Sequence, residues 1–123
     1  MRAADARSVA LAALGAGFAG WLIENAAQGK PRYSRLAPST PLLPVYAAGG
    51  ALVALIAPSL SGRTLSEKML VYGVMLTTLE GAAGMIERMD GRESWDYHGS
   101  VVDPPHALAW ALLGTLLGEI VSP

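Results

Sequence analysis

The chain has no cysteine and few charged residues, and each shortage excludes a class of protein. Without cysteine, neither a disulfide framework nor a thiolate metal site can form. Charged residues make up 15% of the 123 residues, against about 25% in ordinary soluble domains. The formal net charge of -1 gives no excess of cations for a nucleic-acid backbone. We therefore expect no nucleic-acid partner and no disulfide-stabilised scaffold.

The motifs of common enzymes are also missing. Both histidines, His98 and His106, lie in or beside one polar segment, and no serine or cysteine nucleophile is spaced to work with them. Together with Asp96 and Asp103 they could bind a divalent metal, but no HExxH or similar spacing occurs. No glycine-rich segment ends in the lysine and serine of a phosphate loop. The sequence therefore favours a protein that is not an enzyme and predicts no metal and no cofactor, while a membrane-embedded enzyme stays an alternative; any ATP-driven activity would need a separate soluble subunit.

Apolar residues dominate the composition instead. Hydrophobic residues make up 52% of the chain, and the mean hydropathy is +0.37. A soluble domain of this size would show amphipathic helices with a charged outer face, which these apolar stretches lack. We therefore interpret residues 1–123 as a single integral membrane domain whose main partner is the lipid bilayer.

Four apolar stretches are candidates for membrane spans. They cover residues 8–27, 41–60, 68–89 and 105–121. Because about 20 helical residues cross a hydrocarbon core of about 30 Å, the fourth stretch is barely long enough. The predicted fold is an all-α, polytopic membrane protein, a compact four-transmembrane-helix bundle. Basic residues are divided almost evenly between the two sides, so the positive-inside rule leaves the orientation open.

The connections between these stretches carry clear helix-breaking and helix-starting signals. The segment after the first helix, residues 30–41, is basic and contains Pro31 and Pro38. Because proline lacks an amide proton and restricts the residue before it, this segment is predicted to be a proline-rich loop. Before the third helix, Ser66 is the expected N-cap. Two prolines at the end of the polar connection 90–105 suit the start of the last helix.

Two glutamates lie in or at the end of the third stretch. A carboxylate inside a bilayer costs about 2.5 to 3.5 kcal/mol on insertion scales unless it is paired, hydrated or protonated. Helical periodicity places both glutamates on one face together with small residues, so this face should meet protein or water and not lipid. The members of this stripe are Gly73, Thr77, Glu80, Gly84 and Glu87.

The position of each carboxylate decides how it is interpreted. Glu24 shares a face of the first helix with Gly17 and Gly20. Because Glu24 and Glu87 lie near predicted span ends, their side chains could reach the interface, whereas Glu80 lies deeper. For Glu80 we weigh a structural hydrogen bond or ion pair against a role in a transport path.

Short motifs occur in the order and spacing of a known family. Residues 20–24 resemble a glycine-tryptophan-x-x-glutamate signature, and residues 34–49 resemble a segment that starts with an arginine motif and ends in proline, tyrosine and glycine. Residues 79–80 and 95–97 are similar to the family's leucine-glutamate and tryptophan-aspartate-tyrosine elements. Together these motifs resemble the Putative ABC-transporter type IV family of small integral membrane proteins. The resemblance implies a permease-like protein, which we expect in the bacterial plasma (inner) membrane.

The matching residues also suggest a polar site. Arg35 is a permanent cation, and the three intramembrane glutamates are acceptors that could neutralise it inside a helix bundle. Tyr46 and Tyr97 could donate hydrogen bonds to a carboxylate, and Asp96 could cap a turn or join the cluster. The predicted binding or pathway residues are Glu24, Arg35, Tyr46, Glu80, Glu87, Asp96 and Tyr97.

Three functions fit such a cluster. In the first, the carboxylates line a path for protons, cations or a cationic solute, and a homodimer or larger homo-oligomer supplies the helices that a short chain lacks. In the second, the chain is a non-catalytic membrane subunit or sensor, whose cluster is a structural lock and whose aromatic loop binds a partner. A membrane-embedded enzyme is the third.

Overall fold

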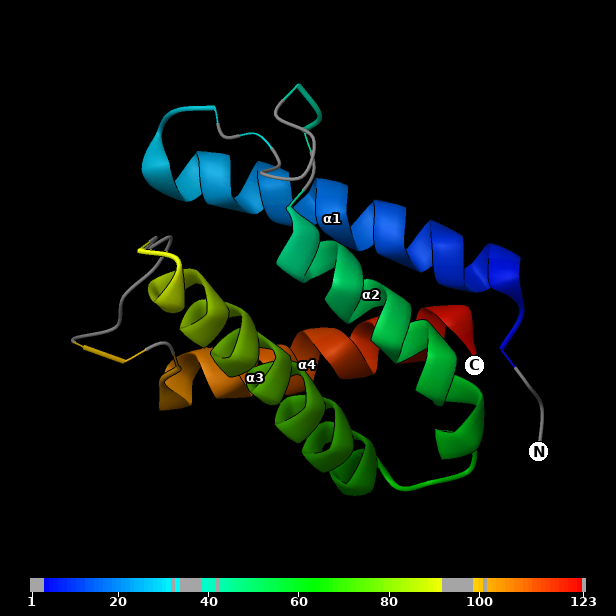
Figure 1. Cartoon of the computed structure of the whole chain (residues 1–123). Coiled ribbons are helices and arrows are strands. Elements are labelled where there is room, and N and C mark those ends of the chain that lie inside the picture. The colour runs from blue at the N-terminus through cyan, green and yellow to red at the C-terminus, as the bar shows by residue number, and fades with distance from the viewer. Residues whose placement is uncertain are drawn as a thin grey trace. The chain divides into compact units, whose positions relative to one another are not determined.

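The computed structural model describes residues 4–31, 33, 39–41, 43–91, 99–100 and 102–122. The regular elements in this part of the chain are all helices (Figure 1), which confirms the predicted all-α class. They are α1 (Ala6–Gln28), α2 (Pro44–Ile56) with its 3-10 continuation η1 (Ala57–Leu60), α3 (Leu65–Met89) and α4 (Pro104–Val121). Each helix lies over one of the apolar stretches that the sequence indicates.

Two of these helices are long and apolar enough to cross a membrane. They are α1, over the 22 residues Ala6–Ala27, and α3, over 25 residues. In the described chain, the apolar helix Pro44–Leu60 is shorter, because it begins only at a proline. Helix α4 has 18 residues, but it opens with two prolines and a histidine and carries Glu119 near its end. The predicted four-span bundle is therefore not confirmed.

Capping interactions fix the beginnings of the two long helices. The Asp5 carboxylate caps α1 by accepting a hydrogen bond from the Ser8 backbone N–H at 2.8 Å. Helix α3 begins with a reciprocal capping box between Thr64 and Glu67. The expected cap, Ser66, is wrong, because the Thr64 hydroxyl accepts from the third helical N–H and leaves Ser66 inside the first turn.

The chain divides into two compact units. The first unit contains the chain up to Ser61 and from Leu117 onward, and the second contains Gly62–Leu116. The prediction of a single domain over residues 1–123 stays a prediction.

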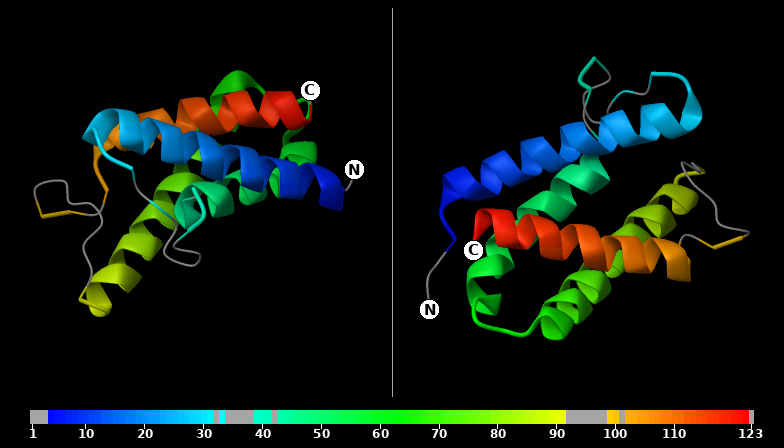
Figure 2. Two further views of the ribbon diagram at one scale, coloured as in Figure 1. Left: turned by 90° about the horizontal axis from the view of Figure 1, so that it is seen from above. Right: turned by 180° about the vertical axis from the view of Figure 1, so that it is seen from behind.

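In the first unit, α1 packs along α2, and the two helices lie side by side in each view (Figure 2). Glycines make this approach close. A Cβ added to Gly50 would lie 2.3 Å from the Ala12 carbonyl oxygen, and one added to Gly20 would lie 2.2 Å from Cγ of Tyr46. The Leu43 N–H donates to the Gly17 carbonyl at 3.4 Å. The small-residue face predicted for the first helix is therefore the face that meets α2.

In the second unit, α3 packs against the first part of α4. Tyr72 and Leu76 of α3 are buried, with 2% and 3% of their surface exposed. They lie against Gly114, where an added Cβ would come within 2.8 Å of both side chains. One turn away, a Cβ on Gly73 would lie 3.0 Å from that of Ala111. Small residues on both helices thus bring the polar face of α3 next to α4.

Candidate functional site

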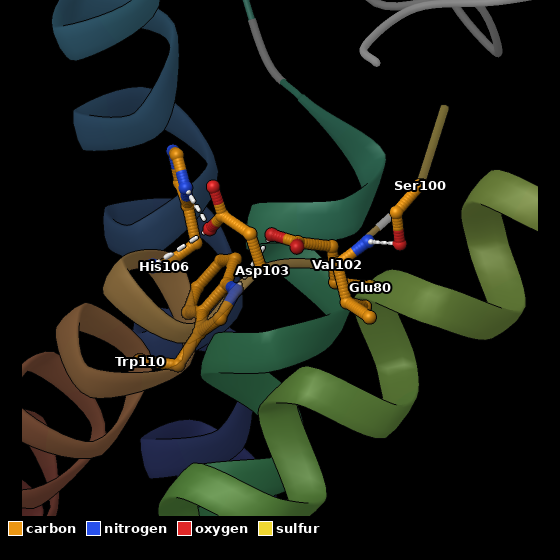
Figure 3. Close-up of polar contacts among 6 residues, drawn as sticks. All are labelled: Glu80, Ser100, Val102, Asp103, His106 and Trp110. Atoms are coloured by element: carbon orange, nitrogen blue, oxygen red, sulfur yellow. Dashed lines mark hydrogen bonds and ion pairs between the residues drawn. The ribbon is translucent and has the colours of Figure 1, made fainter. Parts of the chain in front are cut away.

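A buried carboxylate lies at the centre of the second unit. The Trp110 indole Nε1–H of α4 donates to Glu80 Oε2 of α3 at 2.6 Å (Figure 3). Glu80 is 5% exposed, although it lies in the interior of an otherwise apolar helix. A buried indole N–H needs an acceptor, and a buried carboxylate needs donors, so each side chain satisfies a requirement of the other.

The surroundings of Glu80 contain a further polar atom and a close backbone contact. The Thr77 hydroxyl, one turn earlier on α3, is buried, and among the described residues it has no hydrogen-bond partner. A Cβ added to Gly81 would lie 3.3 Å from Cγ1 of Val102. Val102, two residues before α4, therefore lies against Gly81, the residue that follows Glu80.

That segment ends in an aspartate–histidine pair. Asp103 Oδ1 accepts from the backbone N–H of His106 at 3.0 Å and contacts its ring Nδ1 at 2.5 Å. The Asp103 side chain is 27% exposed and that of His106 is 47% exposed. Helical spacing places Asp103, His106 and Trp110 on one face of α4, and Glu80 reaches from α3 toward this face (Figure 3).

The first unit holds a similar pair. The Tyr46 hydroxyl of α2 donates to Glu24 Oε1 of α1 at 3.3 Å. Both residues are half-buried, and Glu24 lies one turn before the end of α1. The Tyr46 ring lies over Gly20, one turn before Glu24 on the same helix, so the position of the glycine lets the hydroxyl reach the carboxylate.

The structure therefore brings some of the predicted site residues together and leaves others apart. Glu24 contacts Tyr46, and Glu80 contacts a residue that the sequence analysis did not select. Glu87 is half-buried in the last turns of α3. The five residues of the α3 stripe are buried or half-buried, and whether this face meets protein or water instead of lipid stays a prediction. Arg35, Asp96 and Tyr97 lie outside the described residues, so convergence of the carboxylates on Arg35 stays a prediction.

Trp110 is the residue of this site that the sequence analysis missed. Its signal was present, because Trp110 stands one turn before Gly114 in an apolar helix, where an indole N–H must find an acceptor. Asp103 and His106 had been considered only as metal ligands. Among the residues that the structure describes, no group of three or more histidine, cysteine, aspartate or glutamate side chains could hold a metal ion.

The fold and the site together define a small helical protein with two membrane-length helices, one of which carries a buried carboxylate. Residues 14–123 match the Putative ABC-transporter type IV family. This match covers most of the chain, so the chain belongs to that family, and the resemblance carried by the short motifs is confirmed. No curated protein and no solved structure matches the chain. The family description and the two apolar helices are compatible with a membrane protein of the ABC-transporter type.

Proposed function

We propose that this chain is a membrane transport subunit in which Glu80 binds the transported species, a proton, a cation or a cationic solute. The observation that carries the proposal is the 5% exposure of Glu80 inside the membrane-length helix α3. A carboxylate in such a position costs several kcal/mol, on the order of 3, and intramembrane acidic residues commonly mark ion or proton pathways.

The hydrogen bond from Trp110 supports a binding role. The indole N–H is an uncharged donor, so it orients the carboxylate without cancelling the negative charge of its ionised form. A proton or a cation can bind the same carboxylate, and the Thr77 hydroxyl offers a second oxygen one turn away. The arrangement therefore favours a reversible positive occupant at Glu80.

The outer faces of the long helices support a location in the membrane. Large apolar side chains are widely exposed on both, for example Leu14 at 58% on α1 and Val74 at 60% on α3. Extended exposed apolar surfaces mark contact with lipid or with other subunits. We place the chain in the bacterial inner membrane, as a homodimer or larger homo-oligomer, because one copy has too few spanning helices to enclose a path.

A structural role for the carboxylates is the second candidate. It is favoured by the fact that each unit ties its long helix to the next one by a glutamate–aromatic hydrogen bond. In that case Glu24 and Glu80 would act as locks, and the chain would be a non-catalytic subunit or sensor.

Ion flux in liposomes separates the two candidates. The purified chain is reconstituted with an internal pH dye or cation dye, and Glu80→Gln is compared with Glu24→Gln as the matched control. Transport predicts that flux is lost in Glu80→Gln and kept in Glu24→Gln, with both variants folded by circular dichroism. Flux that is unchanged in a folded Glu80→Gln variant contradicts the proposal. Absence of flux in the wild type, with similar destabilisation of both variants, favours the structural lock.

A further inference from the structure

We propose that helix α4 begins at membrane depth and that water reaches its first turn, residues 104–107, at that depth. This inference rests on the proposed function, which places α3 across the bilayer, and it adds the point at which water enters the chain. All the residues that carry it belong to the second unit.

Charged residues mark the two ends of the part of α3 that would cross the bilayer. Lys68 stands in the first turn of the helix and Arg88 in the last. The stretch between them has about 20 residues and a length of about 30 Å, which is the thickness of the hydrocarbon core. Gly73 and Gly81 both lie inside this stretch. A residue that contacts either glycine is therefore at membrane depth.

Contacts with these two glycines place the beginning of α4. A Cβ added to Gly81 would lie 3.3 Å from Cγ1 of Val102, just before the helix. A Cβ added to Gly73 would lie 3.8 Å from the carbonyl oxygen of Ala107, at the end of the first turn. The two glycines are about 12 Å apart along α3. The first turn of α4 therefore begins between them, beside the interior of α3 and not at its end (Figure 3).

This first turn is open at the surface of the chain. Pro104 and Pro105 are exposed, and the side chains of His106 and Asp103 are 47% and 27% exposed. Val102 and Asp103 precede the helix, so their backbone lies outside its hydrogen-bond ladder. Lipid cannot satisfy such backbone groups, and irregular backbone occurs at membrane depth only where protein buries it or where it lines a water-filled space. Since protein does not bury this turn, water is the medium that fits it.

The chemistry of α4 changes sharply after the first turn. The turn carries two ionisable side chains, Asp103 and His106, which are costly to place against acyl chains or to bury in an apolar interface. Further along the same helix, the exposed side chains are apolar, with Leu108 at 57% and Leu112 at 52% exposure. Lipid or a second copy is therefore suited to the later turns of α4, and water to the first.

The connection into α4 shows from which side the water comes. Arg88, in the last turn of α3, donates to the Gly99 carbonyl at 3.1 Å, so this connection passes the end of α3. Gly99 is exposed, and the Ser100 hydroxyl accepts from the Val102 backbone N–H at 3.2 Å. The described residues of the connection thus lead from the end of α3 to Gly81. Water enters from the side of the membrane on which α3 ends.

Cysteine accessibility tests the inference, because the chain contains no cysteine of its own. Single-cysteine variants of the full chain in liposomes receive a charged, membrane-impermeant methanethiosulfonate on both sides of the membrane, so their orientation does not matter. The thiolate attacks the reagent, forms a mixed disulfide and releases methanesulfinate, and the added mass is measured. Because this reaction needs a thiolate and a reagent that stays in water, a cysteine in hydrocarbon is not labelled.

The variants are matched in depth. His106→Cys and Pro105→Cys, in the first turn of α4, should be labelled as fast as Asp90→Cys, which lies exposed just beyond α3. Ala82→Cys and Val74→Cys should stay unlabelled. These two residues are exposed on α3 itself and directly follow Gly81 and Gly73. If His106→Cys does not fold, Pro105→Cys decides the result.

The outcomes separate this inference from the function on which it rests. Protection of the two α4 variants to the same degree as the two α3 variants overturns it, because lipid or a second copy then covers the turn. Labelling of the α3 variants as well shows that α3 is outside the bilayer and contradicts both proposals. Labelling as expected, together with unchanged flux in Glu80→Gln, contradicts transport through Glu80 and leaves the hydrated turn standing.

Discussion

The two units of the molecule use the same kind of bond at different depths. In the first unit, Tyr46 donates to Glu24 at 3.3 Å, near the end of α1 and in a half-buried position. In the second, Trp110 donates to Glu80 at 2.6 Å, in the interior of α3 and at 5% exposure. A carboxylate near a helix end can reach the interface, whereas one in the interior cannot. The same kind of bond therefore joins two helices near a helix end in the first unit and in the interior of a helix in the second.

The position of the glycine explains how the two bonds differ. In the first unit, Gly20 is on the helix of the carboxylate and lies directly under the Tyr46 ring. In the second, Gly114 is on the helix of the aromatic donor and receives Tyr72 and Leu76 from α3. The first arrangement lays one aromatic side chain across a helix, and the second draws the two helices together around the carboxylate.

The largest effect on stability is expected from Gly50→Ala in the first unit. The added Cβ would lie 2.3 Å from the Ala12 carbonyl oxygen, which is backbone and cannot move without separating α1 from α2. We expect the free energy of unfolding in detergent to fall by about 3 kcal/mol or more, at the upper end of overpacking costs. Chemical or thermal unfolding followed by circular dichroism measures this change.

Two further glycine-to-alanine variants test whether the close backbone contact causes the loss of stability in Gly50→Ala. Gly114→Ala in the second unit meets Leu76 Cδ1 and Tyr72 Cβ at 2.8 Å. Because the Leu76 side chain can rotate away, a loss of about 1 to 2 kcal/mol is expected. Gly15→Ala adds a methyl group with nothing within 4 Å and should be neutral or stabilising by up to about 1 kcal/mol. A larger loss for Gly114→Ala than for Gly50→Ala would show that the tighter backbone contact lies in the second unit.

The next effect concerns the two aromatic donors. Trp110→Phe removes the N–H that bonds the buried Glu80 and should cost about 1 to 3 kcal/mol, whereas Tyr46→Phe should cost about 0.5 to 1 kcal/mol. Unfolding of the single variants and of Trp110→Phe in the Glu80→Gln background gives the coupling energy. Equal losses in the free energy of unfolding for Trp110→Phe and Tyr46→Phe, or no coupling between Trp110 and Glu80, would contradict the difference in burial between the two hydrogen bonds.

Much of the fold could be predicted because local signals determine it. Apolar runs and prolines predicted where the helices lie, and helical periodicity placed Glu80 on one face of α3 with small residues. The partner of Glu80 could not be predicted in the same way. The sequence favoured Arg35 as a partner of Glu80, because opposite charges attract. Nothing in the sequence distinguished Trp110 from other tryptophans in apolar helices. Only the close approach of α3 and α4 at Gly114 identifies the indole as the donor.

The number of membrane spans stays a prediction for a related reason. Composition alone does not show where a helix begins, and α2 begins at Pro44, so the preceding apolar residues do not extend it. In α4, the polar residues at the start of the helix and Glu119 near its end shorten the apolar stretch that the sequence predicted as a membrane span. Both uncertain spans depend on the ends of helices, where one or two residues decide whether the bilayer can be crossed.

The smallest expected effect compares the caps of the two long helices. The Ser8 backbone N–H bonded to Asp5 lowers the pKa of this carboxyl below its usual value. The ionised cap therefore stabilises α1 fully above the unfolded pKa of about 3.9, and this contribution is lost as the pH falls through the lower folded pKa. Asp5→Asn keeps a cap without the charge, so its stability should be below that of the wild type above about pH 4 and converge with it at lower pH.

Thr64→Ser, which keeps the hydroxyl cap of α3, serves as the control and should show a pH-independent difference from the wild type. Unfolding midpoints measured from about pH 2 to pH 6 test the contrast, and parallel curves for wild type and Asp5→Asn would mean that the Asp5 charge does not contribute to the cap.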